Sequence, residues 1–346
     1  MKKINLILVI HYLLINNIFS QIGGRGAYAF LNMPSNALSV ALGSNFISAA
    51  NHKDASLSWN NPAALNKNMH QSVSVTYNNY VSDINSGYFS YARHFKKIGT
   101  FSAGAMFINY GKFDGYNPAG ISTGTFTAKD QSFHISYGNQ YNSKLSYGGS
   151  IKYVYSIYEA FVSGGLSTDF SGMYHDTLNK LTMTAFVRNL GYQFIPYSGT
   201  ERQNLATEIA FSISKRLEHL PFTYHAIFHN LQRPDMRYSV NNTGQKDEFG
   251  NSLNKEMTMG DNILRHITVG GELNFTKHFV VRFGYNHMRR KELGQEQRRG
   301  TTGFSWGLGF KAQKINFSYG SATYFPGINS NQFSVMLNLN DFYTKK

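Results

Sequence analysis

The sequence predicts an all-β fold, a fourteen-stranded antiparallel transmembrane β-barrel with an N-terminal plug in its lumen. Apolar and mostly polar residues alternate in many segments, for example at 333–340, and side chains on a strand point to opposite faces with period two. The chain has 23 Tyr, 27 Phe and 32 Gly but only 7 Pro, which is typical of outer-membrane barrels. Short and long links alternate between these segments along the chain.

The first twenty residues have the pattern of a cleaved export signal. Lys2 and Lys3 precede an apolar segment at 4–19, and the small residue Ser20 stands before Gln21. A membrane anchor is the alternative, but three polar residues interrupt the segment: His11, Asn16 and Asn17. We therefore expect a signal peptide at 1–20 and a mature chain that starts near Gln21.

Residues 21–71 lack alternation. Glycines stand at its start, and 37–50 mixes Ala, Leu, Val and Ser as a short helix or an irregular packed segment does. The sequence Trp-Asn-Asn-Pro-Ala-Ala-Leu at 59–65 marks the end of this region. We expect this region to be a plug that packs inside or against the barrel.

The barrel is predicted to occupy 72–346. Strand 279–288 shows the alternation clearly, and the last strand is expected to pair with the first, near Val73 and Val75, to close the cylinder. The expected strands are 72–80, 86–96, 98–110, 124–140, 144–157, 161–176, 179–190, 202–215, 221–231, 262–274, 278–288, 300–312, 313–323 and 331–340.

The lengths of the links predict the orientation of this barrel. Links after even-numbered strands are short, whereas four links after odd-numbered strands are long: 111–123, 191–201, 231–261 and 289–299. Short periplasmic turns and longer extracellular loops are the usual asymmetry, and an even strand number places both barrel ends on the periplasmic side. A soluble β-sandwich has no reason to keep this order.

Composition excludes several other classes. The chain has no Cys, so it has no disulfide, thiol nucleophile or thiolate metal site. Beyond the first twenty residues no apolar run reaches the roughly 18 residues that a membrane helix needs. The formal net charge of +14 is scattered among aromatic residues, so an anionic membrane surface explains it as well as nucleic acid does.

Apparent catalytic motifs have a plainer explanation in a barrel. The GxSxG sequence at 303–307 lies in a predicted strand, whereas a nucleophile elbow needs a turn from strand to helix. His225 and His229 would stand about 13 Å apart on a strand, too far to hold one ion without further ligands. We therefore expect no metal site and no cofactor.

Carboxylates on the predicted strands allow acid–base chemistry in principle. In a barrel lumen such groups usually satisfy one another or meet water, so the structural interpretation is favoured. With no nucleophile and base set visible, we expect no catalytic residue and no enzyme. The residues concerned are Asp169, His175, Asp176, Glu208 and Glu272.

The predicted loop 289–299 is rich in arginine. Guanidinium groups match the geometry of phosphate, so an outer loop at the leaflet surface can contact anionic lipid such as lipopolysaccharide. A solvated charged loop is the alternative. The possible anionic-lipid contacts are Arg289, Arg290, Arg298 and Arg299.

Short sequence segments resemble known families. The sequence at 59–63 resembles the Asn-Pro-Ala signature that ends the plug of FadL-like outer-membrane barrels, which have fourteen strands. Further segments resemble the PorQ family of the bacterial type IX secretion system: 23–34, 41–43, 91–95, 98–101, 108–113 and 123–128. The resemblance assigns a plug motif to Gly23, Gly24, Arg25, Asn61, Pro62 and Ala63.

The PorQ resemblance implies a non-enzymatic barrel in the outer membrane of a Gram-negative bacterium. It would anchor a PorZ-like surface protein, with a PorU-like sortase and a PorV-like barrel, and so link secreted cargo to lipopolysaccharide. The long predicted loop 231–261 is the expected partner contact. The alternative is a FadL-like channel for hydrophobic small molecules, which needs an apolar patch in the lumen and a strand kink.

Overall fold

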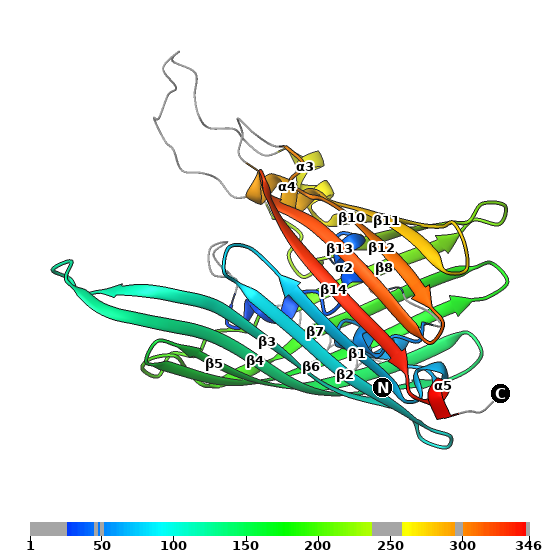
Figure 1. The fold of residues 1–346 in the computed structure, drawn as a ribbon, viewed down its shortest axis with the longest axis horizontal. Coiled ribbons are helices and arrows are strands. Elements are labelled where there is room, and N and C mark those ends of the chain that lie inside the picture. Colours follow the sequence, from blue (N-terminus) through cyan, green and yellow to red (C-terminus); the bar gives the residue numbers. More distant parts are fainter. Residues whose placement is uncertain (1–25, 45–47, 49–51, 237–257, 295–299, 344–346) are drawn as a thin grey trace, which may run out of the picture.

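Fourteen antiparallel strands close into a barrel in the computed structural model, which describes residues 26–44, 48, 52–236, 258–294 and 300–343 (Figure 1). Each strand pairs with its neighbours in sequence, and β1 (Ser72–Asn79) pairs with β14 (Ile328–Asn338). Val73 lies opposite Leu337 and Val75 opposite Val335, so the predicted closure is confirmed. The predicted signal at 1–20 lies outside the described residues.

The strands between this closing pair follow one another as hairpins. They are β2 (Asn85–Phe95), β3 (Gly99–Tyr116), β4 (Ser122–Gln140), β5 (Leu145–Tyr158), β6 (Phe161–Asp176), β7 (Leu181–Ile195), β8 (Glu208–Arg216), β9 (Phe222–Phe228), β10 (Ile267–Asn274), β11 (Phe279–Asn286), β12 (Phe304–Ala312) and β13 (Ile315–Phe325).

Several predicted boundaries are wrong in an informative way. The predicted link 111–123 is mostly strand, because a bulge at Gly111, with φ +90°, lets β3 and β4 continue past the barrel wall. The predicted strand start at 202 is wrong, since β8 begins only at Glu208. The predicted strand start at 262 falls in a helix, α3 (Met259–Arg265), and a second helix, α4 (His287–Leu293), occupies the arginine-rich segment.

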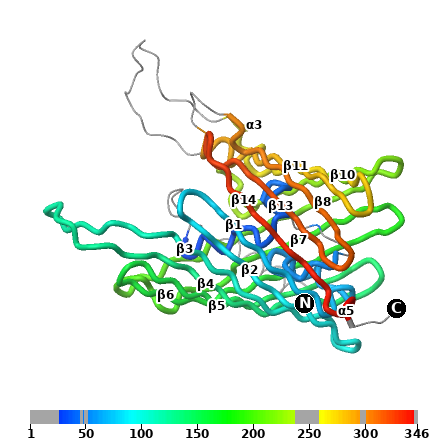
Figure 2. Tube along the Cα trace, viewed as in Figure 1, coloured from blue at the N-terminus to red at the C-terminus, as the bar shows by residue number. Residues whose placement is uncertain are grey.

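The barrel has two unequal sides. Strands β3–β7, here called the tall wall, have 14 to 19 residues, whereas β8–β14, the short wall, have 7 to 11. A tilted strand of about 9 to 11 residues crosses a bilayer, so the tall wall extends beyond one. Its longest part is the hairpin of β3 and β4, which projects from the barrel in Figure 2. We call residues 112–127 the outer ribbon.

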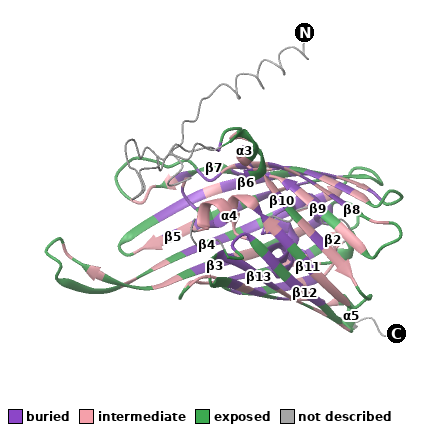
Figure 3. Cartoon of the chain, turned by 90° about the horizontal axis from the view of Figure 1, so that it is seen from above, coloured by how far each residue is buried: buried purple, intermediate pink, exposed green. Residues whose placement is uncertain are grey.

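Side chains alternate between membrane and lumen as the sequence pattern predicts. On β4, Phe133 and Ile135 are exposed on the outside, while Ser132 and His134 are buried inside. Figure 3 shows the same banding of buried and exposed residues along most strands. The outer surface is therefore apolar and aromatic, and the interior is crowded and mostly polar.

Residues 26–71 supply five short helices that pack inside the barrel. They are η1 (Ala29–Asn32), α2 (Ala37–Ala41), η2 (Ala55–Trp59), η3 (Pro62–Ala64) and η4 (Lys67–Met69). Side chains of Asn36 and Asn61 cap α2 and η3 by accepting hydrogen bonds from their first turns. Helix α2 contacts β11–β14, while η3 contacts β4–β6 on the other side. We call these described residues the plug.

Glycines let the plug approach the short wall closely. A Cβ at Gly284 would overlap the backbone of Gly43, and a Cβ at Gly320 would overlap the carbonyl of Ala37. Gly148 on the tall wall meets Pro62 of η3 in the same way. Backbone therefore lies directly against backbone where plug and barrel meet. Among the described residues, no helix combines the length and hydropathy needed to cross a membrane.

Candidate functional site

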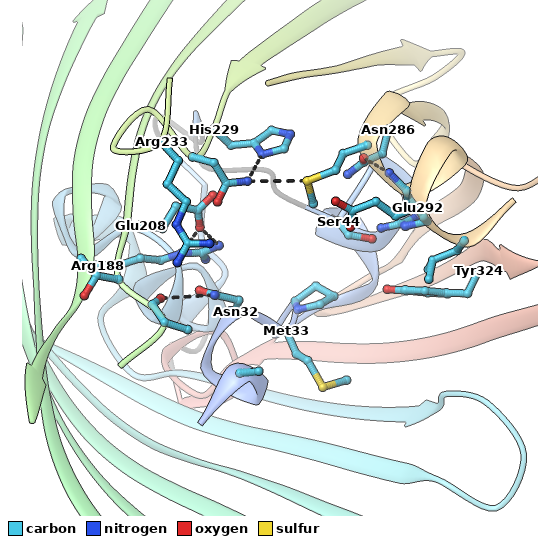
Figure 4. A pocket seen from close by; sticks show the side chains of 18 of the residues that line it. Asn32, Met33, Ser44, Arg188, Glu208, His229, Arg233, Asn286, Glu292 and Tyr324 are labelled. Atoms are coloured by element: carbon cyan, nitrogen blue, oxygen red, sulfur yellow. Dashed lines mark hydrogen bonds and ion pairs between the residues drawn. The ribbon is translucent and has the colours of Figure 1, made fainter. Parts of the chain in front are cut away.

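A pocket of about 370 Å³ lies at the outer mouth of the lumen, between the plug and the loops that follow odd-numbered strands (Figure 4). We call it the outer pocket. Its lining comes from the plug, from both walls and from α4. The residues that matter below are Asn32, Met33, Pro34, Tyr80, Arg188, Glu208, Met288, Arg289, Glu292, Leu293 and Tyr324.

The plug side of the pocket is formed by η1 and the residues just after it. Tyr28, with φ 60°, precedes η1, and its hydroxyl lies 2.6 Å from Ser163 Oγ of β6. At the other end of η1, the Asn32 amide oxygen accepts a hydrogen bond of 2.7 Å from Asn189 Nδ2 of β7. These contacts fix Asn32 and Met33 at the edge of the pocket.

Two buried charges on the pocket wall neutralise each other. Arg188 of β7 donates from Nε to Glu208 Oε2 of β8 at 2.7 Å, and its Nη2 also contacts that oxygen. The Arg188 Nη1 atom lies 3.5 Å from Asn60 Oδ1 of the plug. Strands β7 and β8 bring the two charges together, because Arg188 and Glu208 are register partners. The pair therefore adds no net charge to the pocket.

A network centred on Asp261 holds α3 and α4 together above the short wall. The Asp261 carboxylate lies 2.8 Å from Lys291 Nζ, 3.1 Å from His287 Nε2 and 3.0 Å from Arg265 Nε. Arg265 Nη1 is also 3.7 Å from Glu292. Burial alone would raise the pKa of Asp261, but the hydrogen bonds from Lys291, His287 and Arg265 outweigh it and hold that pKa below its usual range. We call this pair of helices the helical cap.

Arg289 of α4 is the unusual charge in the pocket. It is 7% exposed, and its guanidinium carbon lies 4.3 Å from the centre of the Tyr324 ring. Its Nη2 donates to the Gly43 carbonyl at 3.4 Å, while Nη1 has no hydrogen-bond acceptor. Within the described part of the chain it has no carboxylate partner.

Part of the pocket lining is aromatic or apolar. Tyr80 and Tyr324 pack edge to face with their ring centres 4.7 Å apart, and burial together with Tyr324 raises the pKa of Tyr80. Met33, Met288 and Leu293 also line the pocket. The outer pocket thus combines Arg289, which has no carboxylate partner among the described residues, with an aromatic and apolar part of the wall, while polar groups such as Gln232 and Arg233 line the rest. No local pattern in the sequence indicated this site, because its residues come from segments far apart in the chain.

The residues that resemble catalytic groups in the sequence have structural roles. Ser305 of the GxSxG sequence lies on β12 and donates to the Ala41 carbonyl of the plug at 3.0 Å, so the motif is no nucleophile elbow. The carboxylates singled out on the strands each pair with a basic residue: Asp169 with Lys152, Asp176 with Lys144, Glu208 with Arg188 and Glu272 with Arg282. His175 lies 2.9 Å from Thr182 Oγ1, and His225 lies 2.6 Å from Ser214 Oγ.

The Asn-Pro-Ala part of the predicted plug motif is buried in the barrel near the turn between β4 and β5, away from the outer pocket. Asn61 caps η3, and the Ala63 amide donates to Ser171 Oγ at 2.8 Å while its carbonyl accepts from Ser146 at 2.9 Å. Pro62 lies against Gly148. The motif anchors the plug to β5 and β6. Its first three residues, Gly23, Gly24 and Arg25, lie outside the described residues.

The four arginines proposed to contact lipid do not share one described surface. Arg289 is buried in the outer pocket, whereas Arg290 donates to the carbonyls of Gly300 and Thr302 at 3.3 and 3.2 Å. Arg298 and Arg299 lie outside the described residues, as does most of the predicted partner loop, at 237–257. Lipid contact therefore stays a prediction.

Comparison with known proteins identifies the fold. No family model matches the chain, and no curated protein matches it. The toluene transporter TbuX of Ralstonia pickettii is 12% identical, with a TM-score of 0.51 over 89% of this chain and 98% of that one. The toluene transporter TodX of Pseudomonas putida is 11% identical, with a TM-score of 0.51 over 88% of this chain and 96% of that one. At this level of identity the likeness shows a shared fold alone.

Proposed function

We propose that this chain is an outer-membrane channel for the uptake of small molecules with an apolar body, which bind first in the outer pocket. The observation that carries this proposal is the pocket itself, about 370 Å³ between the plug and the outer mouth. This volume lies in the range of small-molecule sites. The fold shared with two toluene transporters supports the same function.

Passage beyond the pocket requires the plug to move. The plug contacts strands on both walls, and buried hydrogen bonds such as Ser58 Oγ to Ser102 Oγ, at 3.0 Å, hold it there. Fastening the plug covalently should therefore stop transport while the pocket remains intact. The absence of native Cys makes such a crosslink specific.

The test is a disulfide between plug and wall. We expect the double variant Ser58→Cys, Ser102→Cys to admit radiolabelled toluene through a lipopolysaccharide-containing outer membrane, which apolar molecules cross slowly unaided, at least about tenfold more slowly when oxidised than when reduced. The matched control joins Thr323 of β13 to Thr301 in the link before β12, as Thr301→Cys with Thr323→Cys, whose hydroxyl oxygens lie 3.3 Å apart. Its uptake should not depend on oxidation. Equal uptake by the oxidised and reduced plug variant, or none by the native chain, would refute the channel.

The outer ribbon favours a second candidate function, attachment of a surface protein as in the PorQ family. β3 pairs with β2 only as far as Asn109, and β4 pairs with β5 only from Ala128, so within the described chain both edges of the ribbon are unpaired except where the Glu159 amide donates to the Thr127 carbonyl at 3.2 Å. Phe113, Tyr116 and Ile121 are 42, 64 and 65% exposed there. A two-stranded ribbon alone is marginally stable in water, and free edges with aromatic side chains suit a protein partner.

Deletion of the ribbon tests this candidate. Residues 112–127 would be replaced by Asn-Gly, which closes a hairpin, and the barrel would be purified from its own outer membrane. Loss of copurifying PorZ-like, PorU-like and PorV-like proteins would support attachment, with lipopolysaccharide as the cargo acceptor. Copurification that is undiminished by the deletion, or absent from the native chain, would count against a partner at this ribbon.

A further inference from the structure

Two buried arginines, Arg188 and Arg289, line the outer pocket, and the described residues match only one of them with a carboxylate. Arg188 is neutralised by Glu208, and three cations of the helical cap, Arg265, His287 and Lys291, contact Asp261. Arg289 is buried as well but has no carboxylate partner among the described residues. Burying a charge without an opposite charge is costly, so the site is electrostatically incomplete.

The contacts that Arg289 does make compensate for its burial only in part. The face of the Tyr324 ring, 4.3 Å away, attracts the cation, and the Gly43 carbonyl accepts one long hydrogen bond of 3.4 Å. The Nη1 atom has no acceptor among the described residues. A guanidinium presents donors in a planar fork that matches a carboxylate, so an anionic ligand would complete the site.

The surroundings of Arg289 limit what else that ligand contains. Tyr80 and Tyr324 form an aromatic corner, and Met288 and Leu293 of α4 line the same pocket. An inorganic anion would leave these apolar surfaces unfilled, whereas a neutral hydrocarbon would leave Arg289 unpaired. Methionine side chains adapt to flat rings and pack well against them.

We infer that the outer pocket binds a small organic carboxylate, with its carboxylate on Arg289 and its compact apolar body against Tyr324 and Met288. This inference rests on the proposed uptake function and names the class of molecule taken up. It distinguishes this chain from a carrier of neutral hydrocarbons, because the selecting group is a buried arginine.

Titration calorimetry on the full chain in detergent tests the inference with three probes: benzoate, toluene and inorganic phosphate. We expect benzoate to bind at least about tenfold more tightly than toluene or phosphate. The substitution Arg289→Gln should lower the affinity for benzoate at least about tenfold without lowering the affinity for toluene. The matched control is Arg290→Gln, since Arg290 donates to the Gly300 and Thr302 carbonyls instead. Its benzoate affinity should equal that of the native chain.

A second variant covers the case in which Arg289→Gln does not fold. Arg289→Lys keeps the positive charge but loses the planar pair of donors of the guanidinium. Benzoate should therefore bind to this variant with an affinity between those of the native chain and Arg289→Gln. Unchanged benzoate affinity in the folded Arg289 variants, or phosphate or toluene binding as tight as benzoate, would overturn the inference.

The outcomes for binding and for transport are separable. Toluene uptake that the plug crosslink stops, without a preference for benzoate, would refute the carboxylate site and leave the channel standing. Benzoate binding that depends on Arg289, without uptake of any probe, would support the site while the channel function fails.

Discussion

Two contacts of the plug, one with the tall wall and one with the short wall, rest on different chemistry. On the tall wall, Lys152 is fully buried, lies 2.8 Å from Asp169 and stands 4.3 Å from the ring of Trp59 in the plug. On the short wall, α2 lies directly on Gly284 and Gly320, where no side chain intervenes. The first contact depends on a charge being matched, and the second depends on a side chain being absent.

The outer ends of the two walls differ as well. The tall wall ends in strands that continue outward as the ribbon, whereas the short wall ends below α3 and α4 (Figure 1). Short strands leave room for the helical cap, which supplies Arg289 to the pocket. The arginine proposed to select the ligand therefore lies over the short wall, and the ribbon proposed to bind a protein continues the tall wall.

The largest expected effect is on the tall wall. Lys152→Met leaves Asp169 as an unmatched buried charge and should lower the free energy of unfolding by about 3–5 kcal/mol. Denaturant titration in detergent micelles measures it. Adding Asp169→Asn should recover most of the loss, and Lys144→Met should have a much smaller effect, because the Lys144 side chain is 47% exposed and Asp176 keeps its hydrogen bonds from Leu178 and Asn179. A loss that the second substitution does not relieve would show that packing, and not charge, dominates.

The next effect tests the close contact on the short wall. Gly284→Ala places a Cβ against the backbone of Gly43, which cannot rotate away, so we expect a loss of about 1–3 kcal/mol in the free energy of unfolding. The same titration measures it. Gly172→Ala on the tall wall is the control, because a Cβ there has no neighbour within 4 Å. Equal stability of the two variants would mean that α2 adjusts freely.

A smaller effect concerns the helical cap and its dependence on pH. Because the pKa of folded Asp261 is lower than its unfolded value, its ion pairs stabilise the cap above about pH 4 and lose that contribution as pH falls further. Hydrogen exchange of the α3 amides should therefore speed up below pH 4 after correction for intrinsic rates. Asp261→Asn should show the faster exchange already at pH 7, and an unchanged rate in that variant would disprove the role of the network.

The smallest effect is expected from the ribbon. Replacing residues 112–127 by Asn-Gly removes exposed strand beyond the paired wall, so the free energy of unfolding should change by no more than about 0.5 kcal/mol. Denaturant titration of the purified barrel measures this change. A larger loss would mean that the ribbon belongs to the folded core of the tall wall.

The fold was predictable because its signals are local. Alternation at 279–288 and 333–340 and the link lengths carry enough information for fourteen strands and the closing pair. The predicted link 111–123 omits the ribbon because a bulge at Gly111 shifts the register, and the predicted strand start at 262 includes the last four residues of α3, where Ile263 and Leu264 suit a strand as well as a helix. Segment length usually distinguishes a helix from a strand, but a helix of seven residues is no longer than many strands.

The outer pocket was not predictable from the sequence. Arg289 stood out only as one member of a basic loop, and Glu208 only as a lumen carboxylate. Their roles depend on which charges the fold brings together: Glu208 meets Arg188 through the register of β7 and β8, while Arg289 turns inward on α4 toward Gly43. Neither contact has a signature in nearby residues, because the partners lie 20 and 246 positions away.

The seam between β1 and β14 sets the order of assembly. Every other strand pairing joins neighbours in the chain, and such hairpins close short loops at low entropic cost, whereas the seam joins Ser72 to Asn338. The plug amide of Ala37 donates to Ser334 of β14 at 2.8 Å, and α2 also touches β11–β13. A chain that closed its seam first would have to thread a folded segment through a finished cylinder. We therefore expect the barrel to form as a sheet that wraps around its own N-terminal segment, with the seam as the last pairing to form.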